Sequence, residues 1–170
     1  MVELNLTISR EEKADQRCRV QHMNIRLFQN SDTEKVVDIW LEGSLRAHHF
    51  IDSGYWEAQK EAMASLYLPS STTFVLEHED EDNDTIIGFI SLIEQYIAAL
   101  FIDVNAQNRG YGGRLLNHVK KDRDLLDLKV YQKNESATQF YKKNGFHIVE
   151  ETVDSATSEP EYVMKWERES

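Results

Sequence analysis

A glycine-rich loop, Gln107–Gly113 (QNRGYGG), constrains this chain more than any other stretch. It follows the apolar run Ile97–Ile102 and leads into Arg114–Val119, which has helical spacing. The order is therefore strand, glycine loop and helix N-terminus. Glycines allow a sharp turn and the close approach of a ligand, and the first N–H groups of a helix have no partner within it. The stretch predicts an anion site that suits phosphate.

Two familiar phosphate loops do not fit this pattern. A dinucleotide-binding fingerprint requires a third glycine three residues after Gly112, where this chain has Leu115. A P-loop requires Gly-Lys-Ser/Thr, and here Arg114 follows the last glycine. A simple helix-capping turn would also explain the glycines, so the rest of the chain has to distinguish this interpretation from an anion site.

Length and composition narrow the class of protein. The 170 residues predict one domain, and the single cysteine, Cys18, excludes an internal disulfide and favours a reducing compartment. No apolar run is long enough to span a membrane, and residues 1–22 have no apolar segment typical of a signal peptide. We expect a cytoplasmic protein without a membrane partner, either a monomer or a homodimer. Residues 1–22 are predicted to be a polar extension, and residues 23–170 the folded domain. Whether Met23 is the working start stays open.

The charge is large, negative and unevenly spread. The formal net charge of −11 argues against nucleic acid as a partner. Residues 107–145 contain nine Lys/Arg and four Asp/Glu, a net of +5, which leaves −16 for the remainder. The basic segment around the loop suits a polyanionic cofactor, and the acidic remainder suits a cationic substrate.

Periodicity predicts a mixed α/β order of elements. Strands are predicted at 24–28, 72–76, 85–93, 97–102, 128–131, 146–149 and 161–166. Helices are predicted from a capping box at Ser31–Glu34 to about residue 47, at 55–66, from the loop to about residue 123, and from Asn134 to Gly145. The acidic run 77–84 is predicted to be an exposed turn. The strand, loop, helix and strand over 97–131 predict a parallel βαβ unit.

A second motif follows the loop by about twenty residues. It reads Asn134-x-x-Ala137-x-x-Phe140-Tyr141-x-x-x-Gly145-Phe146. The two motifs, in this order and on this pattern of elements, resemble the GNAT superfamily of acyl-CoA-dependent N-acyltransferases across residues 23–166. A finer pattern resembles the small bacterial lysine-acetyltransferase-like branch. It consists of Trp40, Ser44, His49–Ile51 and Val130–Asn134.

The resemblance implies a fold and a cofactor. The fold would be a central mixed α/β sheet, splayed between two strands and flanked by about four helices. Acetyl-CoA would be the cosubstrate, without a metal, and its pantetheine would lie in the splay. The implied cofactor contacts are Ile102, Val104, Gln107, Asn108, Arg109, Gly110, Tyr111, Gly112, Gly113, Asn134 and Tyr141. Position 105 departs from the family pattern, because this chain has Asn105 where relatives often have proline.

The resemblance also implies a reaction, the transfer of an acetyl group to a primary amine by direct attack. The amine would belong to a small molecule or to a protein lysine. Aminolysis of a thioester requires loss of a proton from the amine and protonation of the leaving thiolate. The motif makes Tyr141 the candidate acid, although ring packing alone would also explain its spacing. The base stays open between Glu94, His49 and a water chain.

Two further alternatives remain at this point. A non-catalytic GNAT-like domain could bind acyl-CoA as a sensor. The adjacent His48 and His49 could suggest a metal, but neighbouring residues point apart on a regular element and no ligand cluster accompanies them. We therefore expect a hydrogen-bonded or substrate-facing histidine there, and no metal.

Overall fold

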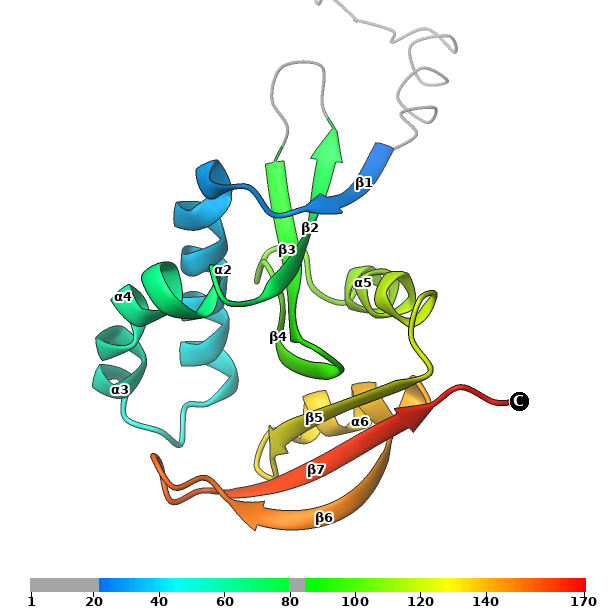
Figure 1. Cartoon of the computed structure of the whole chain (residues 1–170). Helices are drawn as coiled ribbons and strands as arrows, with labels where there is room; N and C mark the ends of the chain where they lie inside the picture. The colour runs from blue at the N-terminus through cyan, green and yellow to red at the C-terminus, as the bar shows by residue number, and fades with distance from the viewer. Residues whose placement is uncertain (1–21, 80–84) are drawn as a thin grey trace, which may run out of the picture.

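A single mixed sheet organises the computed structural model, which describes residues 22–79 and 85–170. Its strand order is β1-β2-β3-β4-β5-β7-β6, and β4 and β5 are parallel neighbours while the other pairs are antiparallel (Figure 1). The strands are β1 (His22–Leu27), β2 (Thr72–Glu79), β3 (Thr85–Ile93), β4 (Tyr96–Ile102), β5 (Leu125–Tyr131), β6 (His147–Val153) and β7 (Pro160–Glu167). The predicted parallel βαβ unit and mixed α/β sheet are confirmed.

Helices cover both faces of the sheet. The helical elements are η1 (Asn30–Asp32), α2 (Thr33–Ala47), α3 (Ser53–Ala58), α4 (Lys60–Ala62), the π-helical turn η2 (Met63–Tyr67), α5 (Tyr111–Lys120) and α6 (Glu135–Lys143). Figure 1 shows α2, α3 and α4 on the opposite side of the strands from α5. No helix in the described ranges is long and apolar enough to cross a membrane. Apart from His22, which begins β1, the predicted extension lies outside the described residues.

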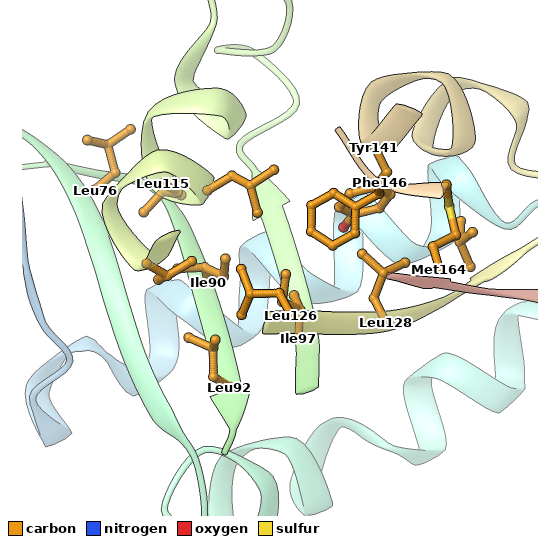
Figure 2. Close-up of a cluster of buried hydrophobic side chains, with 13 residues drawn as sticks. Leu76, Ile90, Leu92, Ile97, Leu115, Leu126, Leu128, Tyr141, Phe146 and Met164 are labelled. Atoms are coloured by element: carbon orange, nitrogen blue, oxygen red, sulfur yellow. The ribbon is translucent and has the colours of Figure 1, made fainter. Parts of the chain in front are cut away.

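Strand alternation explains why the sheet carries two helical layers. Successive side chains point to opposite faces, so neighbours on one strand enter different cores. Val75 and Phe89 pack with α2 and α3, whereas Leu76 and Ile90, the next residues, pack with α5 and α6. The second core continues past the divergence of β4 and β5 to Leu128, Met164 and Tyr141 (Figure 2). This core therefore holds the two halves of the sheet together.

The predicted exposed turn at 77–84 is wrong at its beginning. Glu77 belongs to β2, is 5% exposed, and accepts hydrogen bonds from Asn24 at 3.2 Å and from Arg26 Nε at 2.9 Å. The partners lie on β1, more than fifty positions earlier, so local composition did not reveal them. Residues 80–84 lie outside the described residues.

The predicted capping box at Ser31–Glu34 is also displaced. The short turn η1 precedes α2, and the Asp32 carboxylate accepts from the backbone N–H of Gln29 at 2.8 Å. The same carboxylate receives two hydrogen bonds from Arg26, at 2.7 and 3.1 Å. Arg26 thus joins Asp32 and Glu77, and ties the beginning of α2 to the β1–β2 edge.

We predict that Arg26→Ala destabilises the fold. The substitution leaves two nearly buried carboxylates without their cation, and breaking such a pair costs about 3 kcal/mol at the lower end of the usual range. Arg46→Ala is the matched control, because Arg46 makes only an exposed 4.0 Å pair with Glu42 on α2. The free energy of unfolding of this variant should stay within about 0.5 kcal/mol of the wild-type value. Chemical denaturation of both variants measures the difference, and equal midpoints would contradict the role of Arg26.

The same cluster predicts a pH dependence. The hydrogen bonds from Arg26 hold the pKa of Asp32 below its usual value of 3.8. A carboxyl with a lowered folded-state pKa stabilises the protein above its unfolded-state value, and this stability disappears as the pH falls through the folded-state value. The gap in unfolding free energy between wild type and Arg26→Ala should therefore be full at pH 7 and shrink below about pH 4. Denaturation across that range tests it, and a gap that stays constant would refute it.

Candidate active site

A cleft of about 830 Å³ opens where β4 and β5 diverge. The two parallel strands are paired at one position, Tyr96 with Asp127, where the N–H of Asp127 also donates to the carbonyl of Gln95 at 3.1 Å. Beyond that point β4 continues to pair with β3 while its other edge lines the cleft. A strand edge without a partner offers N–H and C=O groups to an extended ligand.

A bulge in β4 accompanies this divergence. Across β3 and β4, Ser91 pairs with Ala99 and Leu92 pairs with Ile97, so Ala98 is the extra residue. A bulge bends its strand and increases the local twist. Ala98 lies two residues beyond Tyr96, the last paired position, and lines the cleft. The bulge therefore lies where β4 must turn away from β5.

The glycine loop ends at the same cleft. Gly110 has the left-handed conformation, with φ of 81°, and is the N-cap of α5. The N–H groups of Gly112 and Gly113 belong to the first turn and have no intrahelical acceptor. A Cβ on Gly112 would lie 3.2 Å from Cζ of Phe140, so the missing side chain lets α5 approach α6. The geometry fits an anion at the positive end of a helix dipole.

Most of the residues expected to contact the cofactor line this cleft. Those that do are Ile102, Gln107, Asn108, Gly110, Tyr111, Gly112, Gly113, Asn134 and Tyr141. Val104 and Arg109 are not among its lining residues, and the Arg109 guanidinium lies 3.5 Å from the carbonyl of Asn105. The side chain of Gln107 donates to the carbonyl of Ile102 at 3.2 Å, which joins the loop to the end of β4.

Tyr141 combines a packed ring with a place in the cleft. It lies on α6, is 9% exposed, and its ring centroid lies 5.5 Å from that of Phe146 within the core (Figure 2). Burial, with a smaller effect of Tyr96, raises the pKa of Tyr141 above its usual value. The phenol therefore stays protonated at neutral pH and can donate a proton. The packing and donor interpretations of Tyr141 are compatible.

Asn134 links the N-terminus of α6 to a histidine. Its Oδ1 accepts from the N–H of Ala137 at 3.2 Å, which confirms the predicted N-cap of α6. Its Nδ2 lies 3.3 Å from Nε2 of His48, which therefore acts as the acceptor and carries its proton on Nδ1. Burial lowers the pKa of His48 to about 4, so the ring is neutral at pH 7. Within the described ranges Nδ1 of His48 is buried without a hydrogen-bond partner.

The two candidate bases occupy different places. His49 is exposed and lines the cleft. Glu94, the other candidate base, follows the end of β3 at Ile93 and does not face the cleft. It is exposed in the turn between β3 and β4, with φ of 56°, and lies outside the lining. A turn that must reverse the chain directs Glu94 away from the divergence of β4 and β5.

Sequence reasoning assigned no role in the site to three lining residues, Trp56, Tyr131 and Glu161, whereas it expected a hydrogen-bonded or substrate-facing histidine at His48 and His49. The ring centroid of His48 lies 5.0 Å from those of both Trp56 and Tyr131. The hydroxyl of Tyr131 donates to Asp154 at 2.6 Å. Of these residues, Glu161 could have been noticed in the sequence, because it is an acid inside an otherwise largely apolar strand.

Comparisons with known proteins give consistent relatives. The family described as acetyltransferase (GNAT) domain matches residues 69–148. Peptidyl-lysine N-acetyltransferase YiaC of Escherichia coli K12 is 34% identical over 143 residues, covering 84% of this chain and 95% of YiaC. Peptidyl-lysine N-acetyltransferase YjaB of Salmonella typhimurium is 32% identical over 126 residues, covering 74% of this chain and 84% of YjaB.

Solved structures agree on the fold. The solution structure of apo YjaB from Escherichia coli matches with a TM-score of 0.74 and 28% identity, covering 85% of this chain and 97% of YjaB. The PaiA N-acetyltransferase of Thermoplasma acidophilum, in complex with coenzyme A, matches with a TM-score of 0.69 and 21% identity, covering 86% and 99%. The expected splayed α/β sheet is thereby confirmed.

We predict that Gly113→Asp weakens acetyl-CoA binding through charge. A Cβ at this position would meet only Asn144 Oδ1, at 3.9 Å, so a side chain can be accommodated. A carboxylate in the first helical turn favours the helix but repels a pyrophosphate bound there. The dissociation constant should rise at least about tenfold, or 1.4 kcal/mol. Calorimetry measures it.

Gly113→Asn is the matched control, because its side chain has the same size without the charge. It should bind acetyl-CoA more tightly than the aspartate variant. Equal affinity of the aspartate variant and wild type would show that the pyrophosphate does not bind at this helix N-terminus.

Proposed function

Since the chain belongs to the GNAT acetyltransferase family, we propose that it transfers the acetyl group of acetyl-CoA to a lysine side chain of a protein. The observation that carries this proposal is the cleft between the diverging strands, whose one end meets the first turn of α5. An unpaired strand edge and a helix N-terminus together suit pantetheine and its pyrophosphate.

The cofactor occupies the cleft in a defined direction in this proposal. The pyrophosphate accepts hydrogen bonds from the N–H groups of Gly112 and Gly113. The pantetheine extends along β4 as an added strand, and its amides pair with the free backbone groups of β4. This direction brings the thioester toward the closed end of the cleft, where Tyr141 and Tyr96 both line the wall.

The reaction then follows from the groups at that end. The amine of the acceptor loses its proton, attacks the thioester carbon, and forms the C–N bond as the C–S bond breaks. Tyr141 gives its phenolic proton to the departing thiolate. Backbone N–H groups of β4 stabilise the charge that develops on the carbonyl oxygen.

Lysine is favoured as the acceptor by two observations. The relatives YiaC and YjaB are both named peptidyl-lysine N-acetyltransferases. Outside 107–145 the chain carries a net charge of −16, which attracts a protonated lysine. A small-molecule amine is the second candidate, because the same charge would attract a polyamine.

An acceptor panel tests the proposed substrate. The purified protein is incubated with acetyl-CoA and one of three acceptors: a lysine peptide with a blocked N-terminus, a lysine-free peptide with a free N-terminus, or a polyamine. Thiol release gives the rate and mass spectrometry locates the acetyl group. Lysine acetylation supports the proposal. Preference for the polyamine would favour the second candidate, and acetyl-CoA binding without turnover would favour a sensor.

We predict that Tyr141→Phe slows chemistry without weakening cofactor binding. The ring and its packing remain, and only the proton donor is lost. Thiolate charge develops only in the transition state, so acetyl-CoA affinity should hold while kcat falls about 10²–10⁴-fold. Single-turnover rates and calorimetry measure the two quantities separately.

Tyr162→Phe on β7 is the control, because Tyr162 does not line the cleft. Its rate should equal that of wild type. If Tyr141→Phe also stays within about threefold of wild type, well short of the range for acid catalysis, another group or water protonates the thiolate.

A further inference from the structure

Glu161 is a carboxylate in an unusual place. It lies near the start of β7, pairs with Tyr131 across the β5–β7 ladder, and lines the cleft. Only 9% of the residue is exposed. Glutamate is rarely so buried unless a cation or several donors compensate its charge.

Among the described residues, its polar neighbours offer only long contacts to compensate this charge. The Thr152 hydroxyl lies 3.4 Å from Oε2 of Glu161, at the long limit of a hydrogen bond. The ammonium of Lys129 lies 4.0 Å from the same oxygen, and the Lys129 side chain is about half exposed. By contrast the nearby Asp154 accepts from Tyr131, Ala156 and Thr157. Glu161 therefore keeps acceptor capacity for a ligand.

The strand register places Glu161 opposite Tyr131, four residues beyond Asp127, where β5 still pairs with β4. Burial and then the charge of Glu161 raise the pKa of Tyr96, the residue at which β4 and β5 still pair. Tyr96 in turn contributes, after burial, to the raised pKa of Tyr141. All three side chains belong to lining residues. The carboxylate and the phenol proposed as acid thus both line the cleft.

The surroundings also tune the basicity of Glu161. Burial, followed by Asp154, raises its pKa above the usual value of 4.5, while Lys129 and the hydroxyl of Thr152 act in the opposite direction. Raising the pKa of a carboxylate toward neutrality makes it a better proton acceptor for an amine. Ionisable groups with a shifted pKa are found preferentially in functional clefts.

We propose that Glu161 is the general base of the acetyl transfer. It accepts a proton from the protonated acceptor amine, directly or through one water, and becomes a neutral carboxyl. The amine lone pair then forms the C–N bond, the C–S bond breaks, and the thiolate takes its proton from Tyr141. The nitrogen loses its second proton to water, and a proton from water restores the phenol of Tyr141. Glu161 afterwards returns its proton to solvent. This inference rests on the proposed acetyl transfer to an amine, and it assigns the base to neither Glu94 nor His49.

The test is the pH dependence of kcat/KM for wild type and Glu161→Gln on the blocked lysine peptide. At neutral pH the variant should be slower by about 10²-fold or more, with kcat reduced and acetyl-CoA affinity unchanged. Free lysine amine becomes abundant near its own pKa of about 10.4, so the deficit should shrink as the pH rises. Glu94→Gln, which changes an exposed turn residue outside the cleft, should match wild type throughout.

Each outcome either supports or overturns the base role of Glu161. A deficit of the same factor at every pH, or one confined to KM, would overturn the base role and leave Glu161 as a structural or ammonium-binding residue. If the variant does not fold, the wild-type profile alone decides: kcat/KM should fall on acidification with a midpoint above 4.5, and a flat profile overturns the proposal. Failure of wild type to acetylate any amine would overturn the proposed function itself and the base role with it.

Discussion

The site depends on one interrupted strand pairing. β4 and β5 are parallel neighbours that pair only at Tyr96 and Asp127. The bulge at Ala98 lies two residues further along β4. Backbone groups that would normally form hydrogen bonds within a sheet remain available along one edge of β4. The cost of this opening is limited because the α5 and α6 core spans both halves of the sheet. A binding cleft is thus built from a defect that the surrounding packing tolerates.

Helix α6 connects packing to chemistry. Phe140 lies against Gly112, so α6 sets how closely the N-terminus of α5 approaches the cleft. The next residue, Tyr141, buries its ring in the same core and lines the cleft wall. Asn134 caps the helix and contacts His48 from the far side of the cleft. One short helix therefore positions groups on both the cofactor side and the acceptor side.

The two proton-transfer groups that we propose differ in how burial acts on them. Burial raises the pKa of both Tyr141 and Glu161, because each loses hydration of its charged form. For the phenol this preserves the proton that a thiolate needs. For the carboxylate it increases the affinity for the proton that an amine must lose. The same desolvation thus favours opposite roles in an acid and a base.

The sequence by itself determined the order of elements, the glycine loop, the cap at Asn134 and the family resemblance, because these depend on local spacing and backbone preference. Misplaced expectations involved partners distant in sequence. Glu77 is buried because Arg26 lies opposite it on β1, and Glu94 leaves the cleft because of the turn it occupies. Glu161 reaches the cleft only because it pairs with Tyr131 of β5, thirty residues earlier. Strand pairing and burial across such separations are properties of the assembled sheet, so only the tertiary structure decided which carboxylates are paired, exposed or aimed at the site.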